Sequence, residues 1–225
     1  FSEEDVYFLL NDCQLVCFVL KDVSEAFQFF DSQNARGRDL DPHDLLKAFH
    51  LREFSEAEAD LKAITVSHWE SLDSTALSNT FANYLYRIRQ WAEGKSAQHF
   101  NKNKVAVFKG VNLDSIGVYP YTESLRIAHY FVDDYNSQYQ RQIDRQKMRF
   151  PFHLDQMVIN GRRFFEMINY YQQLICQVID DEHHGSNGKQ ITLMGAVLDE
   201  RASTIIHVLN NYPSRYRTGD KYIRN

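Results

Sequence analysis

The stretch between residues 33 and 41 carries the residue types that a phosphate-binding loop requires. It offers an amide, two guanidinium groups and a glycine that permits a positive φ: Asn34, Arg36, Gly37 and Arg38. Asp41 and Pro42 mark the start of the next predicted helix, and backbone amides at a helix start attract anions. These residue types could therefore hold a phosphate of a nucleotide. The alternative is that one arginine pairs with Asp39 or Asp44 and the other is solvated.

Six arginines in the second half of the chain are candidates for contact with nucleic acid. They are Arg145, Arg149, Arg162, Arg163, Arg215 and Arg217. Residues 71–225 carry 19 basic and 15 acidic side chains, a balance of +4, whereas residues 1–70 carry 6 basic and 15 acidic side chains, a balance of -9. Basic residues bind the phosphates of nucleic acid where they converge on one face. We predict such contact for these arginines, with a solvated mixed surface as the alternative.

Arg201 and His207 fit a different chemistry. An arginine followed six positions later by a histidine is similar to the pattern of HEPN-type ribonucleases. In such a site the histidine would act on a hydroxyl beside a phosphodiester, and the arginine would hold the phosphate. Residues six apart on a helix point about 120° from a common face, so the pair converges only with a bend or a dimer partner. A HEPN-like ribonuclease is therefore the enzymatic alternative.

Metal and thiol chemistry find little support in the sequence. His183 and His184 follow three acidic residues at 180–182, but adjacent residues at a helix end point in different directions. We interpret this group as a solvated helix terminus and predict no metal site. Three cysteines form no CxxC pair and lie in apolar runs, which predicts buried free thiols in a reducing cytoplasm: Cys13, Cys17 and Cys176.

The composition of the 225 residues favours a globular, mainly helical protein. Hydrophobic residues make up 44%, too many for a disordered chain, and only 4 Pro and 9 Gly disfavour an all-β fold. No apolar run approaches the roughly 18 residues of a membrane span. Aromatic residues at 14% indicate helices that pack through aromatic faces, with base-stacking surfaces as the alternative. We expect a cytoplasmic protein without membrane contact, and a homo-oligomer is compatible with the sequence.

Helix and strand signals place the candidate residues of the first half. A helix is predicted to begin at Ser2, followed by a buried strand over Leu15–Leu20 and a helix over residues 23–33. The helix that starts at Asp41 is predicted to bury three residues: Leu45, Leu46 and Phe49. Ser55 and Glu58 have the spacing of a capping box, and a further helix is predicted over residues 75–91.

In the second half, helices are predicted over residues 122–139, after Asn160 and over residues 193–210. The helix after Asn160 has apolar residues at steps of 4, 3, 4 and 3, which indicates one buried stripe: Phe164, Ile168, Tyr171, Ile175 and Val178. The polar stretch around residues 92–104 predicts a boundary between domains at 1–95 and 96–225. The predicted fold class is mainly α: a helical bundle with a short N-terminal β element.

The segment EAFQFFDSQNARGRDLDPHDLLK, residues 25–47, resembles a recurring segment of the GmrSD-type restriction endonuclease N-terminal domain family, in the ParB/sulfiredoxin-like superfamily. The shared order is alanine-phenylalanine, then asparagine-x-arginine-glycine, then aspartate-leucine-leucine-lysine. VINGRRFFEMINYYQQLI resembles the start of the helical region that follows that domain. YRTGDKYIRN resembles the segment that leads toward the C-terminal part of the family, often an HNH nuclease. The three matches together span nearly the whole chain.

The resemblance implies the central region of a modification-dependent DNA-defence protein. Residues 1–95 would be the C-terminal part of a ParB-like α+β nucleotide-binding domain, and residues 96–225 a helical domain that binds DNA or a partner. The aspartate-glycine-glutamine-glutamine-arginine motif and the HNH signature of the family both lie outside this sequence, which begins with Phe1. We therefore expect a parent nuclease that uses a nucleoside triphosphate with Mg, and a chain that is not catalytic alone. A protein-interaction scaffold is the remaining alternative.

Overall fold

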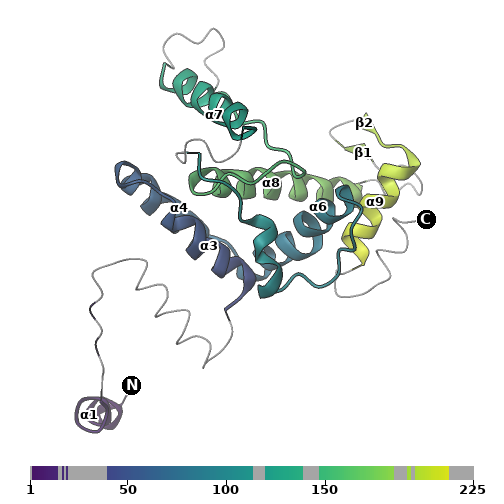
Figure 1. Cartoon of the computed structure of the whole chain (residues 1–225). Helices are drawn as coiled ribbons and strands as arrows, with labels where there is room; N and C mark the ends of the chain where they lie inside the picture. Colours follow the sequence, from purple (N-terminus) through teal and green to yellow (C-terminus); the bar gives the residue numbers. More distant parts are fainter. Residues whose placement is uncertain are drawn as a thin grey trace. The chain divides into compact units, whose positions relative to one another are not determined.

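A computed structural model describes residues 2–14, 17, 19, 40–113, 120–138, 147–184, 192–193 and 196–212. These residues are mainly helical, as the sequence predicts (Figure 1). The chain divides into two compact units, Phe1–Asp39 and Leu40–Asn225. The predicted strand over Leu15–Leu20, apart from the single residues Cys17 and Val19, and the predicted helix over residues 23–33 lie outside the described residues.

The first unit contains helix α1 (Glu3–Asn11). It begins where the sequence predicts because Ser2 and Asp5 form a capping box. The backbone N–H of Ser2 donates to the Asp5 carboxylate at 2.8 Å, and the N–H of Asp5 donates to the Ser2 hydroxyl at 3.2 Å. These hydrogen bonds from Ser2 lower the pKa of the Asp5 carboxyl.

The second unit begins with α3 (Pro42–Arg52), a short 3-10 helix η1 (Glu56–Glu58) and α4 (Ala59–Ser71). The capping box before α4 is confirmed, since the N–H of Ser55 donates to the Glu58 carboxylate at 3.1 Å. The buried face of α3 differs in part from the prediction. Leu46 is buried as expected, but the other two buried positions are histidines, His43 and His50.

One helical stretch then runs from Ser74 to Ala92, close to the predicted range. It consists of α5 (Ser74–Asn79), a π-helix η2 (Thr80–Leu85) and α6 (Tyr86–Ala92). Asp73 caps its start by accepting the N–H of Ala76 at 2.7 Å. The π-helix, in which hydrogen bonds join residues five apart, was not indicated by the sequence. A 3-10 helix η3 (Lys102–Phe108) follows.

The remaining elements are α7 (Thr122–Ser137), α8 (Arg162–His184) and α9 (Glu200–Asn211). The predicted start of the last helix at residue 193 is wrong. Residues there pair as two short antiparallel strands, β1 (Thr192–Leu193) and β2 (Ala196–Val197). The helix starts only after Asp199, whose carboxylate accepts the N–H of Ala202 at 2.7 Å.

A buried arginine holds the C-terminal end of α9 against α6. The Arg87 side chain is 1% exposed, and its Nη1 donates to the carbonyl oxygen of Tyr212 at 2.6 Å and of Val208 at 3.4 Å. Its guanidinium also lies 4.7 Å from the ring centre of Trp91. A cation at this position complements the carbonyls at the end of a helix, so its charge ties α9 to α6.

The main core gathers around Phe164 of α8, which is fully buried. Its ring centre lies 6.2 Å from Trp69 of α4 and 6.2 Å from Phe81 of the π-helix. The core therefore explains the aromatic content by packing between helices. Side chains from both sides of residue 95 belong to this core, so the predicted domain boundary runs through it. A second apolar cluster lies under α7 and includes Leu125, Val132 and Phe150.

Segments before α7 and α8 meet in one parallel bridge between Val111 and Ile159. The N–H of Val111 donates to the Val158 carbonyl at 2.9 Å, and the N–H of Asn160 donates to the Val111 carbonyl at 2.9 Å. Gly110 lies at the closest approach, and the Asn160 side chain accepts its N–H at 2.8 Å. The bridge joins the chain before α7 to the start of α8.

Replacing Gly110 with alanine is expected to open this bridge. A Cβ there would lie 1.7 Å from the Val158 carbonyl oxygen, so the two backbones must separate. Loss of both bridge hydrogen bonds, at about 1 kcal/mol each, should lower the free energy of unfolding by about 2 kcal/mol in urea denaturation. The control is Gly94→Ala, where φ is +69° and no atom lies within 4 Å, with an expected cost of about 1 kcal/mol. Equal costs for the two variants would contradict the clash.

Two sequence predictions concern the whole chain. Among the described residues, no helix combines the length and apolar character needed to cross a membrane. The prediction of buried thiols is wrong, because Cys13, Cys17 and Cys176 are all free and exposed. Cys176 follows Ile175 of the predicted stripe and is turned about 100° away from it, toward solvent.

Candidate nucleic-acid interface

A cleft of about 670 Å³ lies between α7, the segment 147–152 and α8. Four cationic side chains line it, and three of them belong to the predicted nucleic-acid contacts: Lys147, Arg149, Arg162 and Arg163. Two carboxylates, Asp133 and Glu166, also line it. Among the described residues, four positive and two negative groups leave a formal charge of +2 at the cleft. The cleft therefore attracts anions.

Arg163 ties α7 to α8 at the base of this cleft. Its side chain is 5% exposed, and its Nε donates to Nδ1 of His129 at 2.7 Å. The two Nη atoms pair with Asp133, at 2.8 Å, and with Glu166. The guanidinium also lies 4.8 Å from the ring centre of Phe150. Because each guanidinium nitrogen is engaged inside the protein, Arg163 positions the cleft.

Arg162 is more open and shares the same carboxylates. Its side chain is 23% exposed and pairs with Asp133 of α7. Its Nε lies 3.4 Å from Glu166 and 3.8 Å from Glu58, without a hydrogen bond. It also borders a smaller cavity of about 190 Å³ beside α7. Arg162 can therefore contribute charge to a ligand only in competition with these carboxylates.

Lys147 and Arg149 are the two exposed cations of the cleft. They flank Met148, whose backbone is held to α7 by the side chain of Asn136. Asn136 donates to the Met148 carbonyl at 2.9 Å and accepts its N–H at 2.8 Å, as a neighbouring strand would. Within the described part of the chain neither Lys147 nor Arg149 forms an ion pair. These two charges are therefore held in place and open to a phosphate.

His50 fixes the start of α8, which carries Arg162 and Arg163. It is fully buried and stacks on Phe164 with ring centres 3.6 Å apart. Its Nε2–H donates to the Phe108 carbonyl at 3.0 Å, and its Nδ1 accepts the N–H of Gly161 at 3.3 Å. Burial lowers the pKa of His50 to about 3, so the ring is neutral at physiological pH. This neutral form is the one that both hydrogen bonds require.

The other predicted residues do not join this site in the described structure. The predicted phosphate loop, Asn34, Arg36, Gly37 and Arg38, lies outside the described residues, and so do Arg145, Arg215 and Arg217. Arg201 and His207 are both exposed on α9. The His207 ring lies 3.1 Å from the side chain of Asn211, one turn along the same helix. Three of the six predicted arginines therefore line one cleft.

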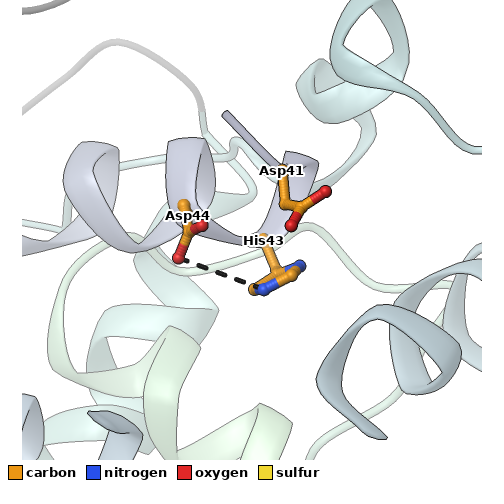
Figure 2. A group of neighbouring side chains, drawn as sticks. All are labelled: Asp41, His43 and Asp44. Carbon is orange, nitrogen blue, oxygen red and sulfur yellow. Dashed lines mark ion pairs between the residues drawn. The ribbon is translucent and has the colours of Figure 1, made fainter. Parts of the chain in front are cut away.

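A group of metal-ligand type that the sequence analysis missed lies at the start of α3 (Figure 2). Ligand atoms of Asp41, His43 and Asp44 lie within 4.8 Å of one another. His43 is 2% exposed, and its Nε2 lies 3.0 Å from the Ser74 hydroxyl and 4.0 Å from the Asp44 carboxylate. Because His43 joins α3 to α5 through Ser74, packing accounts for its burial and orientation.

Sequence reasoning missed the residues that organise the cleft: His129, Asp133, Asn136 and Glu166. Three of them carried a local signal, because His129 and Asp133 are four residues apart on one helix, and so are Arg162 and Glu166. That spacing indicates pairs within a helix. It does not indicate that Asp133 of α7 would instead join two arginines of α8.

These features define a mainly helical protein with a cationic cleft between two helices. A family model described as a family of unknown function, DUF7834, matches residues 61–225. This is more than half of the chain, which therefore belongs to the DUF7834 family. The match includes α7, α8 and every residue named above as lining the cleft. Comparisons with curated proteins and with solved structures gave no match.

Proposed function

We propose that this chain is a nucleic-acid-binding helical module whose contact site is the cleft between α7 and α8. The single observation that carries the proposal is the pair of exposed cations, Lys147 and Arg149, on a backbone that Asn136 holds to α7. Phosphate contact by lysine and arginine supplies most of the sequence-independent affinity for nucleic acid. The other two cations of the cleft, Arg162 and Arg163, are balanced by the carboxylates with which they pair.

The wider proposal is that the module is the central region of a GmrSD-like DNA-defence protein. In this proposal the residues before α3 complete a ParB-like nucleotide-binding domain, including its β element, and Asn34, Arg36, Gly37 and Arg38 face a nucleoside triphosphate with Mg. Support comes from the resemblance of residues 25–47. The chain alone is proposed not to be catalytic, so turnover of a nucleoside triphosphate by the purified chain would contradict this part.

The cleft can be tested by removing its two exposed charges. The double variant Lys147→Ala/Arg149→Ala is expected to weaken binding of a fluorescent DNA about tenfold at low salt, measured by anisotropy. Each phosphate contact contributes nearly one to the slope of log K against log salt concentration. Loss of two contacts should therefore reduce the magnitude of that slope by about 2.

A matched control keeps the same change in net charge. Lys62→Ala/Arg201→Ala removes one lysine and one arginine that do not line the cleft. It is expected to leave the salt slope within 0.5 of the wild-type value, roughly half of one phosphate contact. Equal losses for the two double variants would reject the cleft as the contact site. A loss confined to the control would point to α9 instead.

A further inference from the structure

A second cavity, of about 320 Å³, lies between the π-helix, α8 and α9. Within the part of the chain that the structure describes, no charged side chain lines it. Four carboxamides do so, from three different helical stretches: Asn79, Asn83, Gln172 and Asn210. The Tyr84 hydroxyl, which donates to Asn210 at 2.8 Å, and the Cys176 thiol complete its polar lining together with Thr80. We call this cavity the amide pocket.

The π-helix assembles one wall of the amide pocket. Asn79, Thr80, Asn83 and Tyr84 all come from it or from the residue before it. Asn83 lies four residues after Asn79, and its amide donates to the Asn79 side-chain oxygen at 3.1 Å. Each carboxamide presents a donor and an acceptor. The pocket is therefore suited to an uncharged ligand whose edge also carries donors and acceptors, and its volume is at the lower end for small-ligand sites, roughly 300–1,000 Å³.

The linings of the amide pocket and the cationic cleft adjoin along α8. Asn169 and Gln173 line the cleft, whereas Gln172 and Cys176 line the amide pocket. At 100° per residue these four positions fall within an arc of about 100°, and they span about 10 Å along the helix axis. A site for phosphate and a site for an uncharged polar group therefore border each other on α8.

We propose that the amide pocket receives an unpaired nucleobase of a single nucleic-acid strand whose phosphates lie in the cationic cleft. This inference rests on the proposed function and adds the substrate class, single-stranded nucleic acid. A nucleobase is uncharged and carries donors and acceptors on its edge, which asparagine and glutamine side chains pair with. A base inside a duplex has no free Watson–Crick edge and cannot leave the stack without a free-energy cost. The pocket thus favours single strands over duplexes.

Cys176 allows occupancy of the pocket to be measured directly. In a Cys13→Ser/Cys17→Ser background Cys176 is the only thiol of the chain, and it is exposed. A single-stranded DNA 10-mer of mixed sequence is expected to slow its alkylation at least fivefold at saturation. The same backbone without bases, and the same sequence as a duplex, should leave the rate within twofold of the unliganded protein.

Affinity gives a second readout with a matched pair of variants. Gln172→Ala removes a carboxamide of the pocket, and Gln177→Ala changes an exposed glutamine of the same helix that lines neither site. Gln172→Ala is expected to weaken binding of the single strand about tenfold, the size of one lost base contact. Gln177→Ala should change the affinity for the single strand less than twofold. Neither variant should change the affinity for the base-free backbone more than twofold.

The outcomes separate this inference from the proposed function. Suppose that the single strand binds without protecting Cys176 and that both glutamine variants behave alike. In that case the amide pocket is not a base site, and the proposal that the cleft binds nucleic acid still stands. If Cys176 is protected equally by the base-free backbone, base recognition is rejected. If no nucleic acid binds at all, the proposed function fails and this inference fails with it.

Discussion

Replacing Arg163 with methionine is expected to lower the free energy of unfolding by about 3 kcal/mol, measured by urea denaturation. Removing one partner of a buried ion pair typically costs roughly 3–5 kcal/mol, because the remaining charges lose their compensation. The lower end applies here, since the Asp133 and Glu166 side chains are 37% and 38% exposed and keep part of their hydration. Methionine keeps most of the apolar volume against Phe150, so the loss reports on charge and hydrogen bonds.

The neighbouring arginine provides the control. Arg162→Met removes the same charge from the same two carboxylates, but its side chain is 23% exposed and Arg163 remains to compensate them. We expect a loss of about 1 kcal/mol, in the range of surface ion pairs. A loss for Arg163→Met no greater than that for Arg162→Met would show that Arg163 is not the tie between α7 and α8.

Acid is expected to destabilise the protein through His50. Its folded-state pKa of about 3 lies below the ordinary value of 6.5, so the unfolded chain takes up a proton at a pH where the folded chain does not. The stabilisation is complete above pH 6.5 and is lost as the pH falls from 6.5 to about 3. Each pH unit in this window should remove about 1.4 kcal/mol from the free energy of unfolding.

The variant His50→Gln isolates this contribution from the other acid-sensitive groups. Glutamine can still donate to the Phe108 carbonyl but has no proton to gain. Urea denaturation at pH 7.0, 6.0, 5.0 and 4.5 should show that the variant is less stable at neutral pH. The difference from the wild type should shrink by roughly 2–3 kcal/mol at the lowest pH. Parallel pH profiles for the two proteins would mean that His50 does not resist protonation.

The helices were predictable where burial follows the period of the helix itself. Phe164 and Ile168 were assigned to the core from their spacing, and both are buried. His43 and His50 were not, because a buried histidine depends on partners that spacing along one helix cannot reveal. The Ser74 hydroxyl lies 31 residues from His43, and the Phe108 carbonyl lies 58 residues from His50.

The candidate site was predictable in its charges but not in their roles. The sequence grouped Arg149, Arg162 and Arg163 as equivalent cations, yet one is exposed and one is almost wholly enclosed. What separates them is Asp133, about thirty residues away on another helix. The predicted start of α9 was wrong for a related reason. The apolar run before Asp199 is compatible with a longer helix and also with two short strands followed by a helix cap. The pairing of β1 with β2 decides between the two.

Because of the π-helix between α5 and α6, the number of residues between Thr80 and Leu85 indicates whether a relative can form the amide pocket. A π turn holds one residue more than the α turn that it replaces. A relative with one residue fewer between Thr80 and Leu85 would continue as a regular α-helix, and everything after it would turn by about 100°. Arg87 would then leave the carbonyls of Val208 and Tyr212, and α9, whose Asn210 lines the amide pocket, would lose this tie. Members of the family that keep the amide pocket should therefore also keep the length of this one helical stretch.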